Sequence, residues 1–217
     1  MTTQYTYAIV LDFEATCDDR NPPDPQEIIE FPSVLVSLHE HQVVDEFEAF
    51  VRPVHHPVLT PFCTQLTSIN TQDLADAPAF PQVFEEHQAW LTAHGLDESN
   101  AIIVTCGDWD LATMLPAQCL AAEPPIMSLP LLYSRWHNVK EAYKAVTGRS
   151  KAPGMPGMLR ELGLRLTGYH HRGIDDCRNI AELLLMLHRS GAAVDVTDKL
   201  RTHRYPGLSV RPPNMAG

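Results

Sequence analysis

The chain has 217 residues, 44% of them hydrophobic, which favours one domain with a core of ordinary size. Its 16 Lys and Arg against 27 Asp and Glu give a formal net charge of −11, which excludes a protein that holds duplex nucleic acid by broad phosphate neutralisation. A short footprint, or binding through cations, is compatible with this charge. The five cysteines are widely spaced, and we find neither a membrane-length apolar run nor a signal peptide; we therefore expect reduced thiols, no membrane contact and a cytoplasmic location.

The first part of the chain predicts three strands. The run 7–14 is apolar on both sides through residues 8–11, which is typical of a central, buried strand. The runs 28–38 and 43–51 flank a short polar segment, which favours an antiparallel pair.

Helices and strands alternate in the rest of the chain. We expect a helix over 80–93, a strand over 101–106, a helical stretch over about 110–114, a strand–helix unit within 134–147 and a helix over 175–189. Three strands followed by this alternation predict an α/β fold with a mixed central β-sheet flanked by α-helices. The domain is expected over 1–191, followed by a C-terminal tail over 192–217 that either packs or frays.

Asp12 and Glu14 end the first predicted strand. Residues two apart on a strand point to the same face, so both carboxylates project together while Phe13 points the other way. Such a pair repels unless it is protonated or bridged, and hard divalent cations are its usual partners. By itself the pattern also fits an ordinary strand end at the surface.

Asp108, Trp109 and Asp110 lie where the predicted strand 101–106 turns into a helix. Open α/β sheets carry their chemistry at the carboxyl ends of strands. We also expect one of the two aspartates to cap the helix.

His171, Asp175 and Asp176 lie at the start of the last predicted helix. Asp176 falls on the apolar stripe of this helix, where an acid needs a partner, and a metal ion is a suitable one. Asp175 is one residue off that stripe and is the more natural N-cap. His171 lies on the loop over the same helix end, and its neighbour His170 shows that a histidine here is not in itself a signal.

Each of these three patterns is weak by itself, but together they indicate one kind of active site. Two metal ions held by four acids, with a histidine that deprotonates a water molecule, are the machinery of in-line phosphodiester hydrolysis. Histidine suits the role of base because its pKa lies near neutral pH.

Seven segments, spread over roughly residues 7–189, carry a resemblance to a known family. They are LDFEATCDD (11–19), EIIEFPSVLVS (27–37), FVRP (50–53), TPFC through LTSI (60–69), GDWDL (107–111), WHNVK (136–140) and HRGIDDCRNIA (171–181). In this order and spacing they resemble the DEDD 3′–5′ exonucleases of the histidine branch (DEDDh), which have the ribonuclease-H-like fold. The resemblance extends to the subgroup that trims histone messenger RNA and small interfering RNAs, and to its bacterial relatives.

The resemblance implies a role for each of the five residues. Asp12, Glu14, Asp110 and Asp176 match the four acids of the family, and His171 matches the base. Two Mg²⁺ or Mn²⁺ ions are implied, with Asp12 bridging both, Glu14 and Asp176 in direct contact, and Asp110 partly contacting through water. His171 would take the proton of the attacking water.

The resemblance also implies that Ala15, Phe62, Leu66 and Trp109 shape a pocket for the 3′-terminal nucleotide. Aromatic side chains stack on bases and contribute about 1–3 kcal/mol per base. For Phe62 and Trp109, packing in the core is the alternative interpretation.

The implied activity is metal-dependent hydrolysis of single-stranded RNA or DNA from the 3′ end, with release of nucleoside 5′-monophosphates, by a protein that we expect to be a monomer. Two alternatives stay open. One is a hydrolase of very short oligonucleotides, as in the related oligoribonucleases. The other is a nucleic-acid-binding module without catalysis, which a missing acid or histidine would favour; all five residues are present. The residues do not decide between RNA and DNA.

Overall fold

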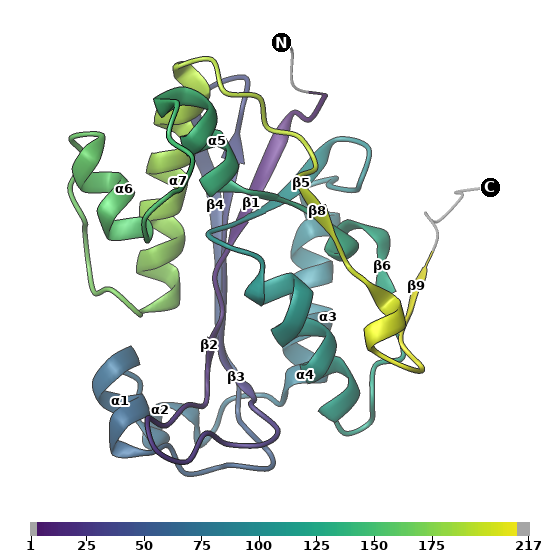
Figure 1. Cartoon of the computed structure of the whole chain (residues 1–217). Helices are drawn as coiled ribbons and strands as arrows, with labels where there is room; N and C mark the ends of the chain where they lie inside the picture. The colour runs from purple at the N-terminus through teal and green to yellow at the C-terminus, as the bar shows by residue number, and fades with distance from the viewer. Residues whose placement is uncertain (1–3, 212–217) are drawn as a thin grey trace.

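A mixed β-sheet forms the centre of the computed structural model, which describes residues 4–211 (Figure 1). The strands of this sheet are β1 (Tyr7–Leu11), β2 (Glu14–Ala15), β3 (Ile28–Ser37), β4 (Gln42–Phe50), β5 (Ala101–Thr105), β7 (Arg135–Asn138) and β8 (Asp198–Lys199). β3 pairs antiparallel with β1, β2 and β4, whereas β5 pairs parallel with β1 and β7. The α/β class and the mixed sheet expected from the sequence are confirmed.

The strand expected over 7–14 is interrupted. β1 and β2 both pair with β3, but Asp12 and Phe13 between them make no strand pairing. The Phe13 N–H instead donates a hydrogen bond to the Asp110 carboxylate, at 2.9 Å. A carboxylate from another element thus takes the place of a strand partner at the carboxyl end of β1.

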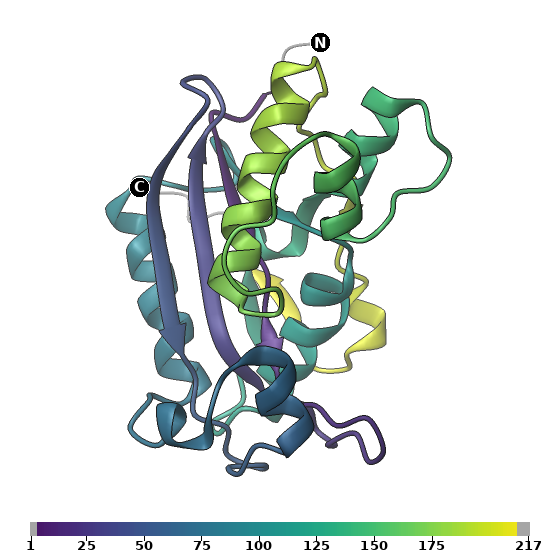
Figure 2. The same ribbon diagram turned by 90° about the vertical axis from the view of Figure 1, so that its left-hand side faces the viewer.

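The helices cover both faces of the sheet, and α3 and α7 lie on opposite sides of it in Figure 2. They are α1 (Pro61–Thr67), α2 (Thr71–Leu74), α3 (Phe80–Ala93), α4 (Leu115–Ala121), α5 (Val139–Thr147), α6 (Met155–Glu161) and α7 (Gly173–Arg189), with a π-helical turn at Asp110–Met114 and 3₁₀ turns at Leu131–Ser134 and Thr202–Arg204. Ile9 and Leu11 pack in the core cluster that includes α3 and α4, whereas Ala8 and Val10 pack in the cluster that includes α5, α6 and α7. This alternation explains why β1 is apolar on both sides.

The segment after α7 returns to the sheet, although it has no hydrophobic periodicity. β8 pairs antiparallel with β7 in the central sheet, whereas β9 (Ser209–Arg211) pairs with β6 (Ser128–Pro130) in a separate two-stranded sheet. Leu200 and Leu208 are buried in the same core cluster as α3. Of the two possibilities for the tail, packing therefore holds for residues 192–211. Residues 212–217 lie outside the described range, and the domain boundary at 191 stays a prediction.

Within residues 4–211, none of the helices combines the length and apolar character that crossing a membrane requires.

Candidate active site

Three carboxylates meet at the break between β1 and β2. Oxygen atoms of Asp12, Glu14 and Asp176 all lie within 4.8 Å of one another. Asp12 and Glu14 reach this point because they flank Phe13, which points to the opposite face and packs edge-on against Phe31, with ring centroids 4.8 Å apart. Asp176 comes from the first turn of α7. The prediction that the carboxylates of Asp12 and Glu14 project to the same face is confirmed.

Burial and mutual repulsion make the charged form of these acids costly. Burial is the largest cause that raises the pKa of Asp12 well above its ordinary value, and the charges of Asp110, Glu14 and Asp176 raise it further. Burial, followed by the charges of Asp176 and Glu30, raises the pKa of Glu14 to about 9. Divalent cations would remove this repulsion, and carboxylate oxygens are the ligands that Mg²⁺ and Mn²⁺ prefer, so the cluster fits such ions.

Asp110 lies beside the cluster, at the start of the π-helical turn. Its side chain is 5% exposed and accepts the hydrogen bond from the Phe13 N–H. Burial raises the pKa of Asp110 to about 6, although the Phe13 N–H opposes the shift. Single π-helical turns inside α-helices are frequent at functional sites. The π-helical turn therefore holds Asp110 next to Asp12, and this turn was not predicted from the sequence.

The prediction that Asp108 or Asp110 caps this helix is wrong. Trp109 occupies the N-cap position, without a side-chain cap. The Asp108 carboxylate accepts hydrogen bonds from Trp136 Nε1, at 2.9 Å, and from Asn138 Nδ2, at 3.2 Å. Asp108 thus ties the turn after β5 to the end of β7.

His171 and His170 lie on the loop before α7, next to Asp176. His171 has a left-handed backbone with φ of 69°, and its N–H donates to Asp176 Oδ2, at 2.9 Å. The two imidazole rings stack with centroids 3.9 Å apart, and His170 Nδ1 lies 3.0 Å from Asp176 Oδ2. Burial, followed by the charge of His170, lowers the pKa of His171, which favours the neutral ring. His170, which was not predicted as a site residue, is part of this site.

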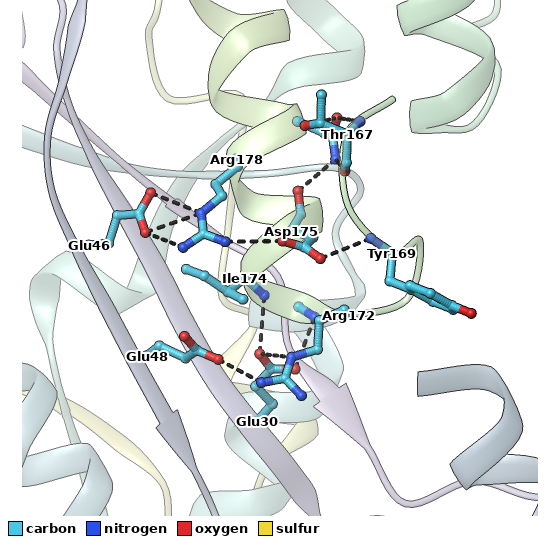
Figure 3. Close-up of polar contacts among 11 residues, drawn as sticks. Glu30, Glu46, Glu48, Thr167, Tyr169, Arg172, Ile174, Asp175 and Arg178 are labelled. Carbon is cyan, nitrogen blue, oxygen red and sulfur yellow. Dashed lines mark hydrogen bonds and ion pairs between the residues drawn. The ribbon is translucent and has the colours of Figure 1, made fainter. Parts of the chain in front are cut away.

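The prediction that Asp175 caps α7 is also wrong, because the helix begins two residues earlier, at Gly173. Asp175 Oδ2 accepts a hydrogen bond from the Tyr169 N–H, at 2.9 Å, and Asp175 Oδ1 pairs with Arg178, at 3.0 Å (Figure 3). These contacts close the loop that carries the two histidines.

The cap of α7 comes instead from Glu30 on β3. Its fully buried carboxylate accepts hydrogen bonds from the N–H groups of Gly173, at 3.0 Å, and Ile174, at 3.2 Å. Arg172 Nε pairs with the same carboxylate, at 3.1 Å, and Arg172 Nη2 reaches Glu48, at 2.7 Å (Figure 3). Burial raises the pKa of Glu30, while Arg172 and the two N–H groups oppose the shift.

A cavity of about 480 Å³ opens over the acid cluster. Ala15, Leu66 and Trp109 line it together with the acids and both histidines. Trp109 is 41% exposed and Phe62 is 36% exposed, so core packing does not explain either ring. Phe62 does not line the cavity but lies on α1, one turn before Leu66.

Besides His170, two residues near the site were not predicted from the sequence. Glu30 is a charged residue inside a fully buried strand, and this pattern could have indicated its role. Lys140 lines the cavity from α5. Its sequence context is an ordinary amphipathic helix, so only the structure reveals its position.

A mixed sheet that gathers four acids and a histidine at one edge defines the class of ribonuclease-H-like nucleases. The family model described as Exonuclease (RNase_T) matches residues 9–184. The chain belongs to this exonuclease family.

Relatives and solved structures agree with this assignment. The chain is 41% identical to ERI1 exoribonuclease 3 from Homo sapiens, over 90% of this chain and 58% of that protein. It is 35% identical to 3′-5′ exoribonuclease 1 from Rattus norvegicus, over 94% of this chain and 59% of that protein. The chain thus spans less than two thirds of the length of these relatives. The nuclease domain of 3′hExo, a DEDDh family member solved with bound rAMP, superposes with a TM-score of 0.83 at 31% identity, over 92% of this chain and 100% of that one.

Proposed function

We propose that the chain is a metal-dependent 3′–5′ exonuclease that hydrolyses single-stranded RNA or DNA from the 3′ end and releases nucleoside 5′-monophosphates. One observation carries the proposal. The oxygen atoms of Asp12, Glu14 and Asp176 lie within 4.8 Å of one another, and the loop that carries His171 contacts the same Asp176 carboxylate. The family membership, and the similarity to relatives that are named exoribonucleases, support the same activity.

Asp12, Glu14 and Asp176 would hold two Mg²⁺ or Mn²⁺ ions, and Asp110 would contribute partly through water. Such ions, when bound, make water a stronger nucleophile and neutralise charge on the phosphate. Without cations, the negative charge of the acid cluster repels a phosphodiester strand. The carboxylates therefore have to be neutralised by bound cations before a substrate can bind.

The remaining residues bind the strand and move a proton. The imidazole of His171 accepts the proton of the attacking water, which contributes a factor of about 10²–10⁴ in general base catalysis. Trp109 presents an exposed ring at the cavity and stacks on the 3′-terminal base, with Leu66 and Ala15 beside the nucleotide. Phe62, on the same helix as Leu66, contacts the strand at the edge of the cavity.

The substrate is a short stretch of single strand. With a net charge of −11, the protein has little electrostatic affinity for duplex nucleic acid, and a cavity of about 480 Å³ accommodates few nucleotides. Relatives named exoribonucleases, and a structure described as 3′-end specific recognition of histone mRNA stem-loop by 3′-exonuclease, favour RNA 3′ ends. The small cavity also keeps an oligoribonuclease-like preference for very short oligonucleotides as a second candidate.

We also propose that the protein is a monomer and that it acts in the cytoplasm. Light scattering on the purified protein tests the oligomeric state, and a mass near that of a dimer contradicts it.

A gel time course on matched 5′-labelled single-stranded RNA and DNA, with Mg²⁺, Mn²⁺ or EDTA, tests the activity. We expect a ladder that shortens from the 3′ end and disappears in EDTA. Substrates of 2, 5 and 20 nucleotides separate the two candidates, because only the oligoribonuclease-like enzyme prefers the dinucleotide. No cleavage of any substrate contradicts both.

A further inference from the structure

We propose that Lys140 binds a backbone phosphate of the nucleic-acid strand through its ammonium group and thereby supplies part of the substrate affinity. This inference rests on the proposed function, because it states how the same site holds an anionic substrate.

The position of Lys140 is fixed by the start of α5. Asn138 caps this helix, accepting a hydrogen bond from the Lys140 N–H, at 3.1 Å. Asn138 also donates to Asp108, at 3.2 Å, which ties the helix start to the turn after β5. In that turn, a Cβ atom at Gly107 would lie 3.7 Å from Lys140 Nζ. The ammonium group is thus held beside the turn that carries Trp109 and Asp110.

The half-buried Lys140 side chain lines the same cavity as the four acids. Among the lining residues, all of which belong to the described range, it is the one Lys or Arg. The positive charge of Lys140 acts on two neighbouring groups in the site. Burial raises the pKa of Cys106 to about 12 and the pKa of Asp110 to about 6, and the charge of Lys140 opposes both shifts.

The ammonium group has no fixed partner of its own. Within residues 4–211, Lys140 Nζ makes no ion pair or hydrogen bond, whereas Lys144, one turn further along α5, pairs with Glu141 at 2.6 Å. Arg172 and Arg178 nearby are both engaged with glutamates. A lysine with three free donors beside a cavity for a phosphodiester is suited to bind a phosphate oxygen.

The competing explanation is that Lys140 only balances the negative charge of the acids. The two roles differ in what removal of the charge changes. A phosphate contact contributes to strand affinity and to its salt dependence, whereas a counter-charge contributes to the affinity of the acid cluster for cations.

The test is the binding of a 5′-fluorescein single-stranded RNA of eight nucleotides, measured by anisotropy in Ca²⁺ over a series of KCl concentrations. Lys140→Met removes the charge and keeps the aliphatic stem, and Lys140→Arg keeps the charge. Lys144→Met, which removes a charge from the same helix outside the cavity, is the matched control. We expect Lys140→Met to raise Kd about tenfold and to reduce the slope of log Kd against log[KCl] by about 0.7, the value for one phosphate of a single strand.

Lys140→Arg and Lys144→Met should both stay within about twofold of the wild-type Kd and keep its salt slope. An unchanged Kd and slope in Lys140→Met overturn the proposal. An unchanged RNA Kd together with an altered Mn²⁺ affinity, measured calorimetrically without RNA, also overturns it in favour of the counter-charge role. If the wild-type protein binds the RNA but shortens none with Mg²⁺ or Mn²⁺, the exonuclease proposal fails, while the Kd of Lys140→Met still decides the role of Lys140.

Discussion

Glu30 caps α7 by accepting a hydrogen bond from the N–H of Gly173, at 3.0 Å. The donor is the first residue of the helix, and the acceptor is a fully buried carboxylate on β3, which pairs with β2 on one side and with β4 on the other. Asp176 lies three residues further along the same first turn. The distance between the helix acid and the strand acids therefore depends on this contact.

We expect Glu30→Gln to reduce both stability and turnover. The amide has one acceptor oxygen where the carboxylate has two, so one of the N–H groups of Gly173 and Ile174 loses its partner and Arg172 loses its counter-charge. Such losses in a buried site cost about 2–3 kcal/mol. Denaturant unfolding measures this loss, and Glu46→Gln is the matched control.

Glu46 pairs with Arg178 on the same surface of α7, at 2.6 Å, but both side chains are partly exposed. Removing an exposed ion pair changes the free energy of unfolding by less than about 1 kcal/mol. Equal losses in the two variants would contradict a special role for Glu30.

We expect Gly173→Ala to displace the start of α7. A Cβ atom there would lie 2.9 Å from the backbone oxygen of Asp12 and 2.9 Å from Pro32 Cγ, closer than real contacts allow. Overpacking of this kind costs about 1–3 kcal/mol and here separates Asp176 from Asp12. The measurement is unfolding free energy together with turnover. Gly154→Ala, whose new Cβ would meet nothing nearer than 3.9 Å, should keep its stability.

We expect Trp109→Ala to raise KM about tenfold with little loss of stability. The ring is 41% exposed at the cavity, so its removal leaves no internal void, whereas one lost stacking contact weakens binding by about 1–3 kcal/mol. Trp109→Phe should restore much of the affinity. A large drop in unfolding free energy with an unchanged KM would show that Trp109 supports the fold and does not contact the substrate.

Stability should fall in mild acid because of His87. This ring is fully buried between Ser33 and Tyr133, and burial lowers its pKa to about 3. In the unfolded chain the pKa of a histidine is about 6.5. Below that pH the unfolded state binds a proton that the native state does not, so the contribution of His87 to stability falls by up to about 1.4 kcal/mol per pH unit.

The difference in unfolding free energy between the wild type and His87→Gln isolates this effect from the other titrating groups. From pH 7 to pH 4.5 the wild type should lose stability relative to the variant. Parallel pH profiles would contradict this expectation, because they would show that the ring has the same pKa in the native and the unfolded state.

Much of the fold was predictable because periodicity and turn residues act locally. The helix over 80–93 and the strand–helix unit within 134–147 are confirmed. The break at Asp12 was not predictable, because it arises from a hydrogen bond between Phe13 and Asp110, 97 residues apart. The packing of β8 and β9 likewise depends on partners far away in the chain.

The candidate site was predictable where residue spacing alone places side chains, as for Asp12 and Glu14 on one face. Both N-cap predictions failed for one physical reason. The N–H groups at the start of α7 find their acceptor in Glu30, 143 residues earlier, and Asp108 is engaged by Trp136 from the neighbouring strand. Tertiary contacts replaced the local caps that the sequence offered.

In the proposed mechanism the acid cluster binds the cations, whereas His171 accepts the proton of the attacking water. The most direct test measures Mn²⁺ affinity by calorimetry and turnover on 5′-labelled RNA at saturating Mn²⁺, in the wild type, His171→Ala and Asp12→Ala. We expect His171→Ala to bind Mn²⁺ within about threefold of the wild type while its turnover falls by a factor of about 10²–10⁴. Asp12→Ala should lose both Mn²⁺ binding and turnover. Wild-type turnover in His171→Ala, or normal Mn²⁺ binding and turnover in Asp12→Ala, would contradict this mechanism.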